Sequence, residues 1–179
     1  MVGLGLVPHT GWAWLVRVRG TRGEATVELR TRVVACDVED AELFHRVEEH
    51  TGDRERFLKD GRAAALRLAH AALAPYLDGG AAIVVGKVAT LLPLEKILAA
   101  HPRMHGAEGE LWRALFAEAC AAAGASAARR TPEEVRTELQ RRHSPAAIAA
   151  FLRRGRETAG APWTREVQEA ALAGWSALA

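Results

Sequence analysis

The stretch that decides the fold is residues 2–34, which read VGLGLVPHTGWAWLVRVRGTRGEATVELRTRVV. From Glu24 to Val34, mostly apolar side chains alternate with polar ones, a pattern typical of an antiparallel strand with one buried face. The preceding Gly20–Gly23 is typical of a hairpin turn. Residues Val2–Val18 are apolar at their start, and Pro8–Gly11 interrupts them with a turn or bulge signal. We therefore predict that Val2–Val18 and Glu24–Val34 are adjacent antiparallel strands.

Working outward, residues 81–86 are short, apolar and β-branched, which favours a buried strand parallel to the first strand on its other side. Helix is expected from Asp40 to about Leu77 with a break at 51–53, and again from about Gly106 to Ala123. A strand candidate at 124–128 precedes helices that begin after Thr131 and Ser144. We predict an α/β fold in one domain, 1–179. Its mixed sheet combines antiparallel hairpin strands with parallel strands, and helices cover both faces.

Composition sets broad limits. The 179 residues are 49% hydrophobic and 26% charged, which is ordinary for a globular domain. No apolar stretch is long enough to span a membrane, so we expect a cytoplasmic protein with no membrane partner. Cys36 and Cys120 match neither a metal-binding spacing nor a disulfide framework. The glycines at 3 and 5 lack the rest of a dinucleotide-binding motif, and no P-loop surrounds Gly86.

Two carboxylates near the C-terminus are the first candidate site. Glu166 and Glu169 lie three residues apart, which places them on one face of a helix. Paired acids in such a position can hold a divalent metal against a phosphodiester. They can also simply complement the helix dipole and solvate the first turn. Both interpretations stay open at this point.

Arginines form the second candidate site. Residues 129–156 contain eight arginines and three glutamates, a local charge of +5. Such a cluster suits contacts with the phosphates of DNA or RNA, although it is also compatible with a solvated helical face. The candidates for nucleic-acid binding are Arg129, Arg130, Arg141, Arg142, Arg153 and Arg154. Five tryptophans could stack on bases, but their spacing favours core or interface positions.

Three stretches together resemble the RuvC-type Holliday-junction resolvases of the RNase H-like superfamily. Residues 5–13, GLVPHTGWA, resemble the opening strand of that family, which reads Gly-Ile-Asp-Pro-Gly followed by Thr-Gly-Trp or Thr-Gly-Tyr. Residues 124–135, GASAARRTPEEV, resemble its fifth strand and the Thr-Pro helix start, and residues 166–173, EVQEAALA, resemble its closing helix. The resemblance implies an RNase H-like fold and a nuclease that holds two metal ions in a carboxylate cluster.

The chain departs from the family at the residues that do this chemistry. The first-strand aspartate is replaced by Val7, and Lys87 stands where the fourth strand normally provides a carboxylate. A valine cannot ligate a hard cation, and a lysine opposes one. Only Glu166 and Glu169 remain, so we expect no cofactor, or a single weakly bound Mg or Mn ion. His9, close to the missing aspartate, could join these two glutamates in a rebuilt site for Mn or Zn.

Further replacements could come from Asp37, His105 and Glu108. The structural alternatives are a turn role for His9, a first-turn dipole partner for Glu108 and a helix N-cap for Asp37.

Three hypotheses of function follow. The first is a non-catalytic RuvC-like protein that binds nucleic acid or a partner protein. The second is a metal-dependent endonuclease or junction resolvase with a remodelled site, in which His9, Glu166 and Glu169 are the catalytic residues. The third is an oligomerising scaffold whose apolar terminal helix packs against a second copy in a homodimer. Loss of both strand carboxylates favours the first and third hypotheses over the second.

Overall fold

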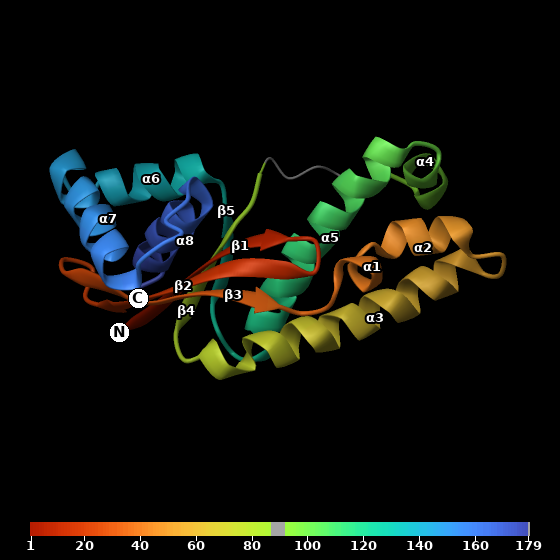
Figure 1. Ribbon diagram of the computed structural model, residues 1–179, viewed down its shortest axis with the longest axis horizontal. Coiled ribbons are helices and arrows are strands. Elements are labelled where there is room, and N and C mark those ends of the chain that lie inside the picture. Colours follow the sequence, from red (N-terminus) through yellow and green to blue (C-terminus); the bar gives the residue numbers. More distant parts are fainter. Residues whose placement is uncertain (87–91, 179) are drawn as a thin grey trace.

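A computed structural model describes residues 1–86 and 92–178 of the chain (Figure 1). Five strands form one sheet in the order β3-β2-β1-β4-β5. Their bounds are Val2–His9 for β1, Trp12–Gly20 for β2, Ala25–Val34 for β3, Gly80–Val84 for β4 and Ala127–Arg130 for β5. Strands β1, β2 and β3 pair antiparallel, whereas β4 pairs parallel with both β1 and β5. The mixed sheet predicted from the sequence is therefore confirmed.

The opening stretch differs from the prediction in one respect. Val2–Val18 is not one strand but a hairpin, so β2 lies between β1 and β3, and only the second half of the stretch adjoins the alternating strand. The hairpin turns at Gly11, whose φ of 78° is a left-handed conformation that glycine adopts without strain. The carbonyl of Gly11 accepts a hydrogen bond from the backbone N–H of Ala35 at 2.8 Å. The turn is thus tied to the end of β3.

The connection from β3 to β4 is helical, as predicted, but it is made of several pieces. They are α1 (Val38–Ala41), α2 (Leu43–Glu49), α3 (Arg54–Leu73) and the short 3-10 helix η1 (Ala74–Tyr76). The break falls where it was expected. After the break, Asp53 caps the start of α3, because its side chain accepts a hydrogen bond from the backbone N–H of Arg56 at 3.0 Å.

The remaining helices are α4 (Leu94–Leu98), α5 (His101–Ala122), α6 (Pro132–Gln140), α7 (Pro145–Ala159) and α8 (Arg165–Ser176). Helix α5 begins five residues earlier than predicted, because Pro102 suits the first turn of a helix. Strand β5 begins three residues later than predicted. The start of α6 is confirmed by a full capping box between Thr131 and Glu134. Among the described residues, no helix has the length and apolar character required to cross a membrane.

Helices cover both faces of the sheet, as predicted, and each face has its own core. Helices α2, α3 and α5 pack on one face, and α6, α7 and α8 lie on the other (Figure 1). Strand β1 divides its side chains between them. Leu4 and Leu6 belong to the α5 side, whereas Val7 belongs to the α8 side.

Helix α8 lies almost directly on the backbone of β1. A Cβ atom added to Gly3 would lie 2.1 Å from the carbonyl oxygen of Gly174, and one added to Gly5 would lie 1.7 Å from that of Ala170. Both distances are far below van der Waals contact, and the opposing atoms are backbone. The two glycines of β1 are therefore the residues that allow α8 to approach the sheet so closely.

This contact predicts a strong effect of Gly5→Ala. The added methyl group must push α8 away from β1, so we expect the free energy of unfolding to fall by at least about 3 kcal/mol, the upper part of the range for overpacked cores. Urea-induced unfolding followed by circular dichroism measures it. The control is Gly106→Ala in α5, where an added Cβ meets nothing within 4 Å. That variant should be neutral or stabilised by up to about 1 kcal/mol. Equal stability of the two variants would contradict the packing described here.

Candidate functional site

The C-terminal end of β1 and the first turn of α8 bring two of the predicted site residues together. The Nε2 atom of His9 lies 3.4 Å from Oε1 of Glu166, and both side chains are partly exposed. Thr164 positions this turn, since its side chain accepts a hydrogen bond from the backbone N–H of Val167. The predicted neighbourhood of the strand end and the helix start is thus present in the structure.

An aromatic and cationic layer flanks His9. Its imidazole stacks on the indole of Trp12, with ring centroids 4.0 Å apart and planes inclined by 6°. The guanidinium of Arg32 lies over the same indole, 4.1 Å from the ring centroid. Trp12 is partly exposed and already contacts His9 and Arg32 of the chain itself.

The electrostatic setting of His9 favours the neutral imidazole. Burial lowers the pKa of the imidazole below its ordinary value of 6.5, the Glu166 carboxylate opposes this shift, and Arg113 and Arg32 add to it. A neutral imidazole retains a lone pair, so His9 and Glu166 together could offer one nitrogen and one oxygen ligand to a single ion.

The other residues assigned to this site have different partners or surroundings. Glu169 forms an ion pair with Arg165 one helical turn away, with 2.8 Å between Oε1 and Nε. Val7 is only 9% exposed and packs in the apolar core between the sheet and α8. Asp37 occupies the N-cap position of α1, but its side chain makes no capping hydrogen bond. Lys87 lies outside the described residues.

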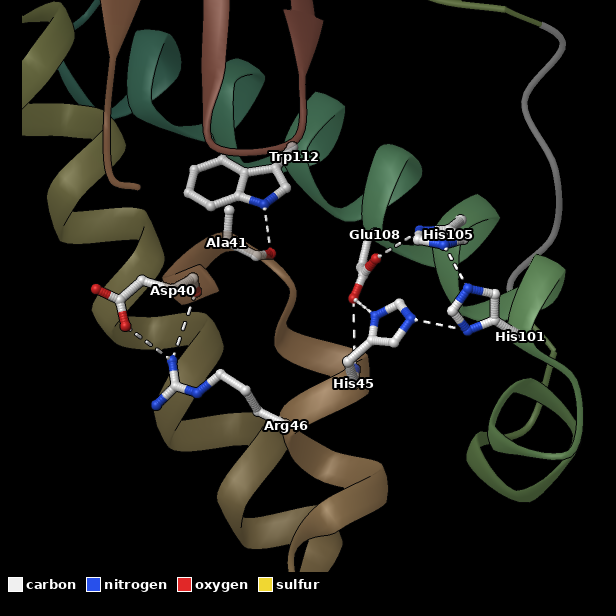
Figure 2. A network of polar contacts seen from close by, with 8 residues as sticks. All are labelled: Asp40, Ala41, His45, Arg46, His101, His105, Glu108 and Trp112. Carbon is white, nitrogen blue, oxygen red and sulfur yellow. Dashed lines mark hydrogen bonds and ion pairs between the residues drawn. The ribbon is translucent and has the colours of Figure 1, made fainter. Parts of the chain in front are cut away.

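His105 and Glu108, the remaining candidates, belong to a different cluster. Figure 2 shows them on α5 together with His101 and facing His45 of α2. Glu108 Oε1 lies 2.8 Å from His45 Nδ1, and His45 Nε2 lies 3.2 Å from His101 Nδ1. Within residues 1–86 and 92–178, the three histidines are the group whose ligand atoms come close enough to share one ion, all lying within 4.8 Å of one another.

Sequence reasoning missed His45 and His101 for different reasons. His101 lies four residues before His105, a spacing that puts both on one helix face, but the helix was expected to begin only at Gly106. Recognising Pro102 as a first-turn residue would have revealed the pair. His45 comes from α2 and is brought to the cluster by tertiary packing, so no local signal indicates it.

The arginines gather only in part. Four of the six candidates, Arg129, Arg130, Arg141 and Arg142, line an open groove of about 900 Å³ beside β5 and α6. Three glutamates line the same groove, which reduces its formal charge to +1. Two of the arginines are tied into the fold, because Arg129 pairs with Glu110 of α5 and Arg130 pairs with Glu138 of α6.

The remaining candidate arginines differ in whether a carboxylate pairs with them. Glu138 also contacts Arg142 at 3.4 Å, whereas no carboxylate among the described residues forms an ion pair with Arg141, Arg153 or Arg154. All three are exposed, the first at the end of α6 and the others on α7. The charge available to a ligand is therefore smaller than the sequence sum of +5 and is carried by fewer residues.

The chain has a RuvC-like fold. The chain is similar to the solved structure of Thermus thermophilus RuvC, with a TM-score of 0.54 and 13% sequence identity over 98% of this chain and 92% of that one. It is similar also to T. thermophilus RuvC in complex with a Holliday junction substrate, with a TM-score of 0.56 and 13% identity over 98% and 91% of the two chains. No protein-family model and no curated protein sequence matches the chain. The likeness therefore concerns the fold, as the sequence motifs implied.

The lowered pKa of His9 predicts a pH dependence of stability. In the unfolded chain the imidazole takes up a proton near pH 6.5, whereas the folded chain does so only at lower pH. Between the two pKa values the unfolded state binds more protons, so the free energy of unfolding falls as the pH falls. We expect His9→Asn to lose less stability than the wild type when the pH is lowered from about 7.5 to about 5.5. Thermal unfolding at each pH measures this difference.

The exposed His70 of α3 provides the control for this measurement. A His70→Asn variant should follow the wild-type profile. Parallel profiles for the wild type and His9→Asn would show that the folded state does not disfavour protonation of His9.

Proposed function

We propose that this chain is a non-catalytic nucleic-acid-binding protein built on the RuvC-like fold. The observation that carries the proposal is the side chain at the end of β1. The family resemblance assigns this position to the aspartate that bridges two metal ions, and here Val7 packs its hydrocarbon side chain in the core against α8. A two-metal mechanism needs carboxylate oxygens on both ions, and a valine supplies none.

The acids of α8 do not offset this loss. Glu169 is engaged by Arg165, and Glu166 faces the imidazole of His9 and not a second carboxylate. One imidazole and one carboxylate can hold one ion weakly, but two ions need more ligands than these. The residues present do not fit the two-metal centre that the fold family implies, and no cleavage step is assigned to them.

Two observations support nucleic acid as the partner. One solved structure with the same fold is bound to a Holliday junction substrate. The exposed arginines at the end of α6 and on α7 can contact phosphates, and arginine suits such contacts because its guanidinium donates two hydrogen bonds at once. The scaffold hypothesis receives less support, because α8 buries its apolar residues, Val167 and Ala170–Trp175, inside the chain's own core.

A remodelled metal-dependent nuclease is the second candidate, and the specific observation in its favour is the 3.4 Å approach of His9 to Glu166. It predicts that the unmodified protein cleaves a substrate and that Glu166→Gln abolishes this cleavage.

Our proposal predicts no measurable cutting of a four-way DNA junction in the presence of Mg or Mn. Each missing ligand of a two-metal site removes several kcal/mol of transition-state stabilisation, and every 1.4 kcal/mol is about tenfold in rate. Val7→Asp alone should not restore cutting. The informative variant combines Val7→Asp with Lys87→Glu and provides acids at both altered positions. Gel assays with a fluorescent junction measure cleavage, and Glu166→Gln sets the background. Cutting by the unmodified protein above that background would contradict the proposal and support the nuclease.

For binding, the free arginines predict a salt-sensitive interaction. Charge reversal of Arg141, Arg153 and Arg154 to Glu should weaken duplex or junction binding. It should also reduce the slope of log affinity against log salt by about 0.9 for each phosphate that the variant no longer neutralises, or about 2.7 if each arginine neutralises one. Fluorescence anisotropy at several salt concentrations measures both quantities. Glu166→Gln should bind as the wild type does.

The matched control reverses three exposed cations of α3, with Arg56, Lys59 and Arg67 changed to Glu. It alters the net charge equally but leaves α6 and α7 intact. Equal loss of affinity in both triple variants would show that only net charge matters. Failure of duplex, junction and RNA to bind at low salt would leave a partner protein as the ligand.

A further inference from the structure

The cluster on α2 and α5 is a closed ring of four polar contacts (Figure 2). Two link the carboxylate to histidines: Glu108 Oε1 lies 2.8 Å from His45 Nδ1, and Glu108 Oε2 lies 3.5 Å from His105 Nδ1. Two link the imidazoles: His45 Nε2 lies 3.2 Å from His101 Nδ1, and His101 Nε2 lies 2.9 Å from His105 Nε2. Every nitrogen of the three rings takes part.

Counting protons shows that this ring is incomplete. Four hydrogen bonds need four protons, but three neutral imidazoles carry one each and an ionised carboxylate carries none. One contact must therefore place two lone pairs against each other. The longest contact is the one between His105 and Oε2 of Glu108, and that oxygen is buried without a hydrogen-bond partner.

Because Glu108 is buried, the missing hydrogen bond destabilises the folded state. Glu108 is 0% exposed and lies among core residues of α5, so water cannot satisfy its second oxygen. A buried carboxylate needs partners for both oxygens, or it destabilises the fold. One more positively charged or electrophilic species in the cluster would allow both oxygens of Glu108 to accept a hydrogen bond.

We propose that the cluster binds one divalent transition-metal ion, Zn²⁺ in the first place, through His45, His101 and His105. With a metal at the two Nε2 atoms of His45 and His105, both rings carry their proton on Nδ1 and both donate to Glu108. The carboxylate then has a donor on each oxygen, an arrangement common behind metal-ligating histidines. His101 supplies its ligand through one of its two nitrogens, both of which face the other rings.

The distances fit this ion. Zn–N bonds of 2.0–2.1 Å in a tetrahedron separate the nitrogens by about 3.3 Å. The contacts of His101 with His45 and His105 measure 3.2 and 2.9 Å, but they use different nitrogens of His101. One ligand atom from each ring can be chosen so that all three lie within 4.8 Å of one another, and rotation of the exposed rings brings them to the tetrahedral spacing. An imidazole donor set favours zinc and its neighbours in the transition series over magnesium, which prefers oxygen.

The cluster leaves one coordination position open. His101 and His105 are exposed and His45 is partly so, which lets water or a small ligand complete the tetrahedron. The ion would also join the short helix α2 to the first turns of α5, adding a link between two segments far apart in the sequence.

The test uses the full chain stripped of metal with a chelator. Isothermal titration calorimetry with Zn²⁺ near neutral pH should give one ion per chain, and Co²⁺ should give the visible absorption bands of a tetrahedral site. His101→Ala should weaken binding by more than about 100-fold, and Glu108→Gln, which keeps shape but loses charge, by about 10- to 100-fold. Zinc should raise the unfolding temperature of the wild type but not that of His101→Ala.

Two controls separate this site from others. His70→Ala removes an exposed histidine of α3, and Glu166→Gln removes the acid at the end of β1; both should bind zinc as the wild type does. His101 is exposed, so its replacement should leave the circular dichroism spectrum unchanged. Wild-type affinity in His101→Ala would overturn the proposal. So would an absence of saturable zinc or cobalt binding in the wild type, which would leave a proton as the species that completes the ring.

Discussion

The contact on which the rest of the structure depends is the direct packing of α8 on the backbone of β1. Four residues of helix advance about 6 Å and two residues of strand about 6.7 Å, so the two elements keep nearly the same step along their line of contact. Gly174 lies over Gly3, and Ala170 lies over Gly5. Continuing this line brings the first turn of α8 to the end of β1, where Glu166 meets His9. The position of the candidate site is thus a consequence of small residues placed elsewhere on the same two elements.

Local signals made much of the fold predictable, and tertiary contacts decided the rest. The alternation before Val34 and the capping box at Thr131 are properties of a few neighbouring residues, so the sequence was sufficient for them. The hairpin at Gly11 depends on a backbone angle. The residues of Pro8–Gly11 are compatible with either a hairpin turn or a bulge, so the sequence did not distinguish the two. The sequence alone does not reveal the packing role of the β1 glycines, because that role depends on the position of α8. The sequence motifs led to the strand end and Glu166, but His45 reaches its partners only through the packing of α2 on α5.

The arginines illustrate how a charge count along the chain misjudges a surface. The window from 129 to 156 excludes Glu110, a buried residue of α5 that pairs with the partly buried Arg129. Arg113 also lies 3.5 Å from Glu110, so Arg129 is one of two cations that neutralise this buried carboxylate, and its charge is already used within the fold. Arg130 is held similarly by Glu138. Arg141 lies three residues from Glu138 and Arg154 lies three residues from Glu157, yet neither arginine forms an ion pair among the described residues. Only the structure therefore separates the paired arginines from the free ones.

Donor chemistry distinguishes the two clusters that the structure assembles. At the end of β1, the structure brings together one carboxylate and one imidazole, whereas a hard ion such as Mg²⁺ prefers several oxygen ligands. On the opposite side of the sheet, three imidazoles converge on one point, and a buried carboxylate orients two of them from behind. Nitrogen ligands on a helix pair select a softer ion than oxygen ligands at a strand end. The two clusters share no residue, so the donor set of the first places no limit on what the second can bind.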